Sequence, residues 1–157
     1  AERLALSLTD QPIYFATARI WDEEFKERVK RHQARRGDNW TNIEEEKYLS
    51  HHTIYNKVCV VDCITLWCTN FFFDANQNNP KEPVIDEALD AIKKEFDQFT
   101  AQDATFIFVT NEIGSGGVSD NVVQRRFTDM EGWMNQYVAS KADEVVLMVS
   151  GIPVKIK

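Results

Sequence analysis

The chain alternates between short runs of apolar residues and longer stretches in which apolar residues recur every three or four positions. Four short runs predict β-strands, at Pro12–Thr17, Lys57–Asp62, Ala104–Thr110 and Glu144–Ser150. The second run, KVCVVD, does not alternate apolar with polar residues. Both faces of such a strand must be covered, which is typical of a parallel sheet between two layers of helices.

The stretches between the strands predict helices. They lie in Ala1–Leu8, in Trp21–Trp40 with a stop at Gly37, and in Cys63–Phe73, Val84–Phe99 and Asn121–Ala139. A further short helix is expected to begin at Glu44–Glu46. No repeat or linker interrupts this order. We therefore predict a single α/β domain over residues 1–157, with a mostly parallel sheet and helices on both faces.

Polar or small residues follow each predicted strand. The strand ends read Thr17-Ala18-Arg19, Asp62, Thr110-Asn111-Glu112 and Ser150-Gly151. Because ligands of open α/β sheets bind at the carboxyl ends of the strands, this edge is the expected site. A carboxylate that closes a buried strand, as Asp62 does, is the arrangement with which P-loop enzymes hold Mg²⁺. Any strand that leaves a core can also end in an aspartate, so a structural role for Asp62 stays open.

A strongly basic segment surrounds His32. Between Lys26 and Arg36 the chain has six basic residues and one acidic residue, and Arg28, His32 and Arg36 recur every four positions along one polar helix face. Nearby cations disfavour protonation of an imidazole, so His32 is expected to be largely neutral at pH 7. Its lone pair can then attack a phosphate while fixed positive charge stabilises the transition state. A solvated basic helix face with an incidental histidine explains the same pattern.

Composition narrows the choice of function. The chain has 157 residues and a formal net charge of -7, which argues against bulk nucleic-acid binding. No apolar run approaches the roughly 20 residues of a membrane span, and the first residues carry no signal-peptide pattern. Cys59, Cys63 and Cys68 match no zinc spacing and lie in or beside an apolar run. Buried free thiols and a cytoplasmic location are therefore expected.

Several segments together resemble one protein family. They are YFATARIWDEEFKERVKRHQARR (Tyr14–Arg36), VVDCITLWCTN (Val60–Asn70), VTNEIGSGGV (Val109–Val118), the run Arg125–Lys157, and AERLA at the start. In this order, and over nearly the whole chain, they are similar to the bifunctional adenosylcobinamide kinase/adenosylcobinamide-phosphate guanylyltransferases of cobalamin biosynthesis.

The resemblance implies a P-loop NTPase-like (RecA-like) α/β fold, a homotrimer, and two reactions on one corrinoid substrate. One reaction phosphorylates adenosylcobinamide with ATP or GTP. The other transfers GMP from GTP to that phosphate through a guanylylated histidine, with Mg²⁺ offsetting charge in both. His32 matches the family's catalytic histidine. The family's nucleotide contacts match Thr17, Ala18, Arg19, Arg28, Gln33, Ala34, Arg35, Arg36, Glu44 and Asp62, of which Asp62 is also the expected metal ligand.

The chain departs from the family pattern in three places. The family begins with a strand and a G-x-x-x-x-G-K-S loop that cradles phosphates, and this chain starts after them, so about fifteen further residues are expected upstream. Gln33 stands where an arginine is frequent, and Gly37 where a proline is usual. Two alternatives stay open: a guanylyltransferase without kinase activity, and a nucleotide- or corrinoid-binding module without turnover.

An aromatic cluster independently predicts an oligomer. Within Leu66–Phe73 lie Trp67, Phe71, Phe72 and Phe73, more apolar surface than one short helix is expected to turn inward. Exposed clusters of that size mark interfaces, so we predict a homo-oligomer in which this segment is buried between subunits.

Overall fold

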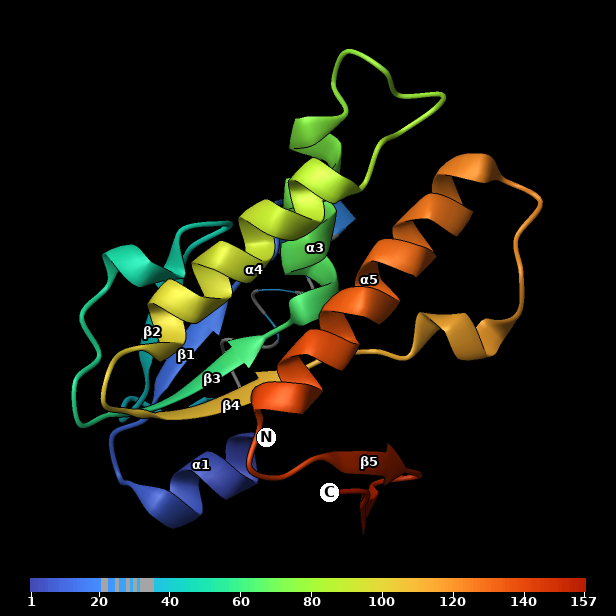
Figure 1. The fold of residues 1–157 in the computed structure, drawn as a ribbon. Coiled ribbons are helices and arrows are strands. Elements are labelled where there is room, and N and C mark those ends of the chain that lie inside the picture. Colours follow the sequence, from blue (N-terminus) through green and yellow to red (C-terminus); the bar gives the residue numbers. More distant parts are fainter. Residues whose placement is uncertain (21–22, 25, 28, 30, 32–35) are drawn as a thin grey trace.

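Four parallel strands form the central sheet of the computed structural model, which describes residues 1–20, 23–24, 26–27, 29, 31 and 36–157 (Figure 1). The strands are β1 (Ile13–Ala16), β2 (Thr41–Glu44), β3 (Val58–Asp62) and β4 (Thr105–Val109), in the spatial order β2-β1-β3-β4. The predicted α/β class and the predicted parallel sheet are therefore confirmed. Since all four strands run the same way, their carboxyl ends lie at one edge.

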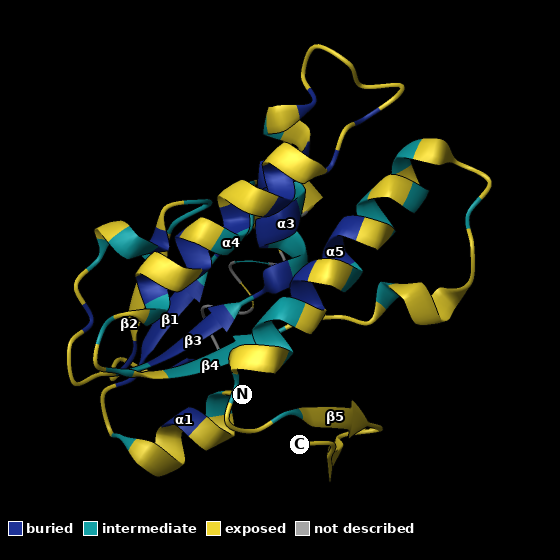
Figure 2. Cartoon of the chain, viewed as in Figure 1, coloured by how far each residue is buried: buried dark blue, intermediate teal, exposed yellow. Residues whose placement is uncertain are grey.

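Helices cover both faces of this sheet. On one face lies α1 (Glu2–Leu8), where Ala5 packs in a small cluster with Tyr14, Trp40 and Val60. The larger core lies on the opposite face, under α3 (Ile64–Ala75), α4 (Asp86–Thr100) and α5 (Val122–Lys141). In Figure 2 the buried stripes of α3, α4 and α5 face the sheet and one another.

The strands β1 and β3 supply side chains to both clusters, which explains their continuous apolar sequence. Phe15 and Val61 belong to the larger core, whereas Tyr14 and Val60 belong to the cluster under α1. Successive residues of a strand point to opposite faces of the sheet. A strand covered on both sides therefore needs an apolar residue at nearly every position, as the sequence predicted.

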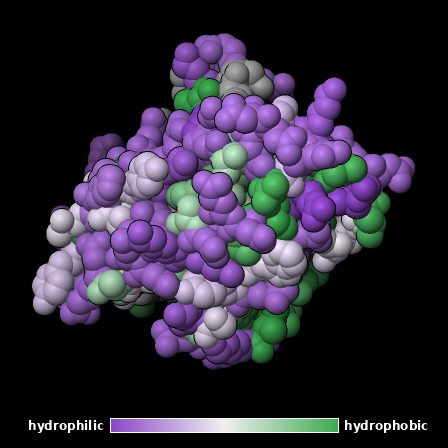
Figure 3. Space-filling view, turned by 45° about the horizontal axis from the view of Figure 1, so that its top comes forward, coloured by the Kyte–Doolittle hydropathy of each residue, from purple (hydrophilic) through white to green (hydrophobic). Residues whose placement is uncertain are grey.

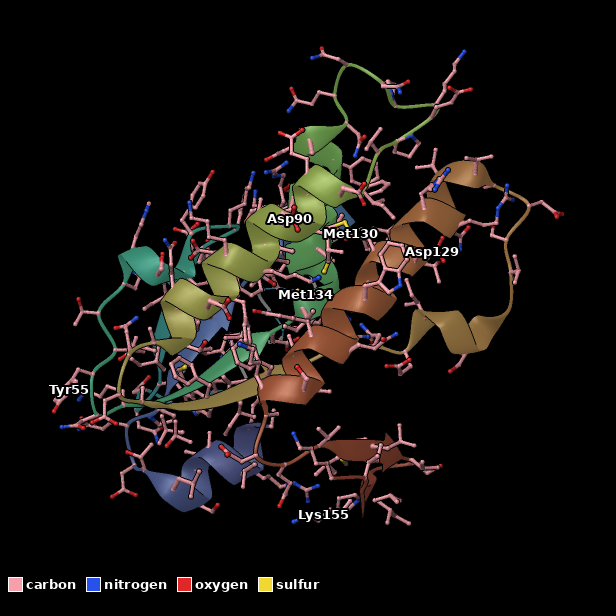
Figure 4. All side chains as sticks on the ribbon, in the orientation of Figure 1. Tyr55, Asp90, Asp129, Met130, Met134 and Lys155 are labelled. Carbon is pink, nitrogen blue, oxygen red and sulfur yellow. The ribbon has the colours of Figure 1, made fainter. Side chains whose placement is uncertain are left out.

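The aromatic cluster of α3 is part of the core, so the interface predicted from it is wrong. Trp67 is 0% exposed, Phe72 1% and Phe71 4%, and only Phe73 is largely exposed, at 46%. These rings are covered by α4, by the loop before β3 and by α5, whose Met130 and Met134 lie on the side that faces α3 (Figure 4). The sequence argument failed because it counted the apolar area of one helix without the neighbours that pack on it.

The short helix predicted to begin at Glu44–Glu46 does not begin there. Glu44 is the last residue of strand β2, and a short 3-10 helix, η1 (Leu49–His51), begins only five residues later. In β2, Asn42 pairs with Tyr14, and Glu44 pairs with Ala16. Three of its four residues are exposed, since β2 is an edge strand with little to bury. Such a strand carries no apolar pattern that marks it in the sequence.

The fourth predicted strand does form, but it does not join the parallel sheet. Strand β5 (Val146–Val149) pairs antiparallel with β6 (Ile152–Lys155) in a separate two-stranded sheet. Ser150 and Gly151 connect them with positive φ values of 50° and 80°. Two central residues with positive φ form the tight turn of a hairpin, which returns the chain directly beside the strand it has left. Ser150-Gly151 is therefore a hairpin turn and not a strand end at the predicted site.

Two further predictions, a helix in the basic segment and buried free thiols, are confirmed for described residues, although residues 36–40 are not helical. The described residues between Glu23 and Arg31 are helical, as expected for the basic segment, while Arg28, His32, Gln33, Ala34 and Arg35 lie outside the described residues. Cys59, Cys63 and Cys68 are free and buried. The glycine-rich stretch after β4 contains the 3-10 helix η2 (Ile113–Gly116). Among the described helices, none is long and apolar enough to cross a membrane.

Candidate functional site

The carboxyl edge of the sheet brings together several predicted site residues. Ala16, the last residue of β1, pairs with Glu44 on one side and with Asp62 on the other, and Asp62 pairs with Val109. Thr17 follows directly, and its backbone N–H donates to the carbonyl oxygen of Asp62 at 3.2 Å. Thr17 and Asp62 thus meet at one edge, as the sequence predicted. Glu44, which the sequence predicted to begin a helix, joins them as the last residue of β2.

The side chain of Thr17 links the end of β1 to the start of α3 through hydrogen bonds. Its hydroxyl donates to the carbonyl oxygen of Cys63 at 2.8 Å and accepts from the backbone N–H of Cys63 at 2.9 Å. The residue is 0% exposed. Its side chain therefore fixes the turn that follows Asp62. The sequence predicted a nucleotide contact for Thr17 but did not indicate this structural role.

Arg19 is engaged by two carboxylates. Its Nη1 and Nη2 donate to the two oxygens of Asp74 at 2.8 and 3.1 Å, and its Nε donates to Glu46 at 2.6 Å. The bidentate hydrogen bond from Arg19 is the main cause that lowers the pKa of Asp74 to about 2. In this arrangement the guanidinium of Arg19 connects the loop after β1 to the end of α3, while Ala18 beside it is half-buried.

Asn70 is a buried polar residue of the site that sequence reasoning missed. Its Nδ2 donates to the carbonyl oxygens of Thr17 at 2.7 Å and Glu46 at 2.9 Å, so it joins the loops that follow β1 and β2. Its Oδ1 is buried without a hydrogen bond among the described residues. The signal was an asparagine inside the apolar run of α3, where a polar side chain needs a specific partner.

Asp62 presents one carboxylate oxygen to Tyr14 and keeps the other open. The hydroxyl of Tyr14 donates to Oδ2 of Asp62. In the described part of the chain, Oδ1 receives no hydrogen bond. Burial, and then the hydrogen bond to Asp62, raise the pKa of Tyr14 well above its usual range, so the hydroxyl stays protonated and remains a donor.

This geometry fits a site that shares Mg²⁺ with a phosphate ligand. The described residues contain no cluster of three or more histidine, cysteine or carboxylate side chains that would enclose a metal ion. Mg²⁺ often binds through only one or two protein carboxylates, with phosphate oxygens and waters completing its shell. The open Oδ1 of Asp62 at the edge of the sheet would be one such ligand.

A second polar network, which the sequence did not predict, lies beside Asp62 at the end of β4. The hydroxyl of Thr65 donates to Glu131 at 2.9 Å and accepts from the side-chain amide of Asn111 at 2.9 Å. Asn135 donates to the carbonyl oxygen of Asn111 at 2.9 Å and accepts from Thr110 at 2.6 Å. Burial raises the pKa of Glu131, which is 1% exposed. The network connects α3, α5 and the residues after β4, and so holds Thr110 and Asn111 at the predicted edge.

Arg36 ends the basic segment and is buried. Its guanidinium carbon lies 3.5 Å from the centre of the Tyr14 ring, and its Nε donates to Asn42 at 2.8 Å. Its Nη1 lies 3.5 Å from Glu2 of α1. The sequence predicted that Arg36 lies on a polar helix face. In the structure its guanidinium instead packs against the face of the sheet that α1 covers.

Two surface hollows over the described residues lie away from this edge. One, of about 400 Å³, is lined by α3 and α4 and includes Lys47 and Asp74. The other, of about 430 Å³, lies between η2 and the start of α5 and includes Arg125 and Arg126. Asp62 and Thr17 line neither of these two hollows, and the strand ends define the candidate site.

The fold and the site define a class. The open, parallel sheet brings a threonine and two carboxylates together at its carboxyl edge. This arrangement is typical of ligand-binding α/β proteins, in which the ligand binds at that edge. The model of one protein family, described as cobinamide kinase / cobinamide phosphate guanyltransferase, matches residues 1–156. The chain belongs to this family, as the resemblance of its segments implied.

Characterised relatives agree with this assignment. The chain is 35% identical over 158 residues to the bifunctional adenosylcobalamin biosynthesis protein CobU of Escherichia coli (strain K12), an alignment that covers 95% of this chain and 87% of the relative. It is 35% identical over 156 residues to the protein of the same name from Salmonella typhimurium, covering 94% and 86%. It is 31% identical over 163 residues to the bifunctional adenosylcobalamin biosynthesis protein CobP of Pseudomonas aeruginosa, covering 100% and 88%.

Proposed function

We propose that this protein phosphorylates adenosylcobinamide with a nucleoside triphosphate and then transfers GMP from GTP to the adenosylcobinamide phosphate. The observation that carries the proposal is the family match over residues 1–156, together with relatives that are named as bifunctional proteins of adenosylcobalamin biosynthesis. The carboxyl edge of the sheet, with Thr17, Glu44 and Asp62, offers a place for the nucleotide.

His32 is the proposed nucleophile of the second reaction. A lone pair of its imidazole attacks the α-phosphorus of GTP, a phosphorus–nitrogen bond forms, and the bond to the departing pyrophosphate breaks. A phosphate oxygen of the substrate then attacks the same phosphorus, the phosphorus–nitrogen bond breaks, and the imidazole is restored. The basic residues around His32 in the sequence support this role because they supply positive charge to the phosphate oxygens.

The other predicted site residues keep their roles as proposals. All of them are proposed to contact the nucleotide. Thr17, Ala18, Arg19, Glu44 and Asp62 lie at the sheet edge or just after it, and Arg28, Gln33, Ala34, Arg35 and Arg36 lie near His32 in the sequence. Asp62 would hold Mg²⁺ through its open oxygen. When bound, the ion neutralises charge on the phosphate oxygens in both reactions.

The function is tested by following both reactions in the full-length protein. With adenosylcobinamide, Mg²⁺ and ATP or GTP, we expect the phosphorylated corrinoid, and with GTP we then expect the GDP-linked corrinoid and pyrophosphate. Chromatography with mass detection identifies each product. GMP transfer without phosphorylation would reduce the proposal to a guanylyltransferase, and binding of nucleotide without either product would replace it with a binding module.

We also propose that the protein works in the cytoplasm as a homotrimer, in line with the family resemblance. Its three buried free thiols suit a reducing compartment. Among the described residues, one group of exposed apolar side chains lies on the hairpin of β5 and β6, where Met148, Ile152 and Val154 are 56%, 66% and 47% exposed. Figure 3 shows apolar patches along the margin of a face that is otherwise largely hydrophilic.

Light scattering of the full-length protein at tens of micromolar tests the assembly. We expect a mass about three times that of one chain, because exposed apolar surface of this kind is normally covered in a soluble oligomer. A monomer at that concentration would contradict the proposed trimer. It would not contradict the two proposed reactions.

A further inference from the structure

Tyr14 connects two residues that the sequence assigned to the nucleotide site. Its hydroxyl donates to Asp62 Oδ2, and its ring lies under the guanidinium of Arg36. The three side chains therefore form a chain of contacts from the end of the basic segment to the end of strand β3. Sequence reasoning gave Tyr14 no role beyond an apolar position in β1.

The position of Tyr14 in the sheet explains how it reaches Asp62. Ala16 pairs directly with Asp62, and Tyr14 lies two residues before Ala16 in the same strand. Side chains two residues apart in a strand share one face of the sheet, so Tyr14 and Asp62 lie on the face that α1 covers. The phenol is long enough to span this offset along the strand and to deliver its hydroxyl to the carboxylate.

The ring of Tyr14 is held on several sides. Tyr14 is 5% exposed, and Trp40 meets its ring edge-on, with the ring centres 6.1 Å apart. Arg36 lies over the ring at 3.5 Å, and its side chain is only 3% exposed. The hydrogen bond from Arg36 Nε to Asn42, which pairs with Tyr14, fixes the guanidinium plane above the ring. A planar guanidinium stacks on an aromatic face in a way that a lysine ammonium does not.

We propose that Tyr14 is a positioning residue that fixes the orientation of the Asp62 carboxylate, and that Arg36 holds the Tyr14 ring in the place this requires. The inference rests on the proposed function, in which Asp62 binds Mg²⁺. The terminal torsion of an aspartate has broad, shallow minima, so an unrestrained carboxylate samples many orientations. With Oδ2 bound to Tyr14, Oδ1 points consistently toward the site. Partners of this kind typically change metal affinity by about 10- to 100-fold when they are removed.

The test measures metal binding directly, without turnover. Mn²⁺ is titrated into the full-length protein with a GTP analogue that carries a methylene group between the α- and β-phosphorus, which blocks attack by histidine. The bound ion is measured from the loss of the paramagnetic resonance signal of free Mn²⁺, after subtraction of a titration without protein. The variants are Tyr14→Phe, Asp62→Asn, the double variant, and Tyr137→Phe as a matched control.

Tyr137 is a suitable control because its hydroxyl also donates to a carboxylate, that of Asp97, at 2.6 Å, between α5 and α4. Tyr137→Phe removes the same atom from the same type of hydrogen bond away from the sheet edge. We expect Tyr14→Phe to weaken Mn²⁺ binding by about tenfold, and Tyr137→Phe to leave it unchanged. In the Asp62→Asn background, Tyr14→Phe should add no further loss, since the group it orients is no longer a carboxylate.

The outcomes separate the inference from the proposed function. If Asp62→Asn weakens Mn²⁺ binding and Tyr14→Phe does not, the positioning role is wrong while the metal role of Asp62 stands. If Asp62→Asn leaves Mn²⁺ binding unchanged, the metal role is wrong and the positioning role falls with it. Equal losses in Tyr14→Phe and Tyr137→Phe would mean a general effect on stability and would also overturn the inference.

Arg36→Lys provides a second variant if Tyr14→Phe does not keep the circular dichroism spectrum of the folded protein. It preserves the charge and the Tyr14 hydroxyl but loses the planar stack and the bond from Nε to Asn42. We expect Mn²⁺ binding to weaken by about threefold or more, a smaller loss than the range for direct partners because the hydroxyl itself remains. Unchanged Mn²⁺ binding in folded Arg36→Lys would contradict the role of Arg36.

Discussion

Replacing His32 with asparagine is expected to abolish covalent labelling of the full-length protein by α-labelled GTP. Asparagine is polar and similar in size but has no nucleophilic nitrogen, so the phosphorus–nitrogen bond cannot form. We expect labelling to fall by at least about a thousandfold, because loss of a nucleophile removes the covalent route altogether. Phosphorylation of adenosylcobinamide does not use this nitrogen and should largely survive. Acid-free precipitation of the protein, followed by counting of bound label, measures the first effect.

Two further variants make this result specific. His51→Asn is the matched histidine control, because His51 is exposed and stacks on Tyr48 away from the strand ends. It should label at the wild-type rate. Arg28→Ala should weaken labelling without abolishing it, since it removes one positive charge among several and leaves the attacking atom in place. If His32→Asn is labelled at the wild-type rate, His32 is not the nucleophile. The basic segment is then explained as a solvated helix face.

Replacing Asp62 with asparagine is expected to slow both reactions by at least about tenfold while the protein stays folded. The amide has the shape of the carboxylate and still accepts the hydrogen bond from Tyr14, but it lacks the negative charge that holds Mg²⁺. More Mg²⁺ should therefore be needed for half-maximal rate. Rates are measured over a series of Mg²⁺ concentrations, and the unfolding temperature is measured alongside.

Asp90→Asn serves as the control for Asp62→Asn. Asp90 is an exposed aspartate on α4 (Figure 4), so its substitution removes one negative charge without touching the sheet edge. It should leave both the rates and the Mg²⁺ dependence unchanged. If Asp62→Asn also keeps wild-type rates and Mg²⁺ dependence, Asp62 is a structural end to β3.

The sequence predicted the parts of the fold whose apolar pattern is strong. Strands β1, β3 and β4 are continuous apolar runs because residues such as Phe15 and Val60 are buried on opposite faces of one sheet. Strand β2 is an exposed edge, so its residues carry no such pattern. The run that forms β5 was assigned to the parallel sheet, and its hairpin with β6 was missed. An apolar run indicates that a segment is buried or paired, but it does not identify the partner strand. The Ser150-Gly151 turn was the signal that should have identified it.

The sequence predicted the edge of the sheet at which the site lies, but it did not predict the hydrogen bonds between the site residues. Strand ends converge by geometry alone, which is why Thr17 and Asp62 meet as expected. Glu44 joins them because it ends β2, a strand that the sequence did not predict. What each side chain does there depends on partners distant in sequence. Asn70 joins the loops after β1 and β2, and Tyr14 orients toward Asp62, through hydrogen bonds between residues 24 to 53 positions apart. No local pattern contains that information.

The account depends most directly on where GMP becomes attached. The full-length protein is incubated with GTP and Mg²⁺ without the corrinoid, digested at alkaline pH, and analysed by mass spectrometry that preserves the modification. We predict a mass increase equal to GMP on the peptide that carries His32, assigned to the imidazole, stable in base and lost in acid. GMP attached to another residue, or an adduct that survives acid as a phosphorus–oxygen bond would, contradicts the proposed mechanism.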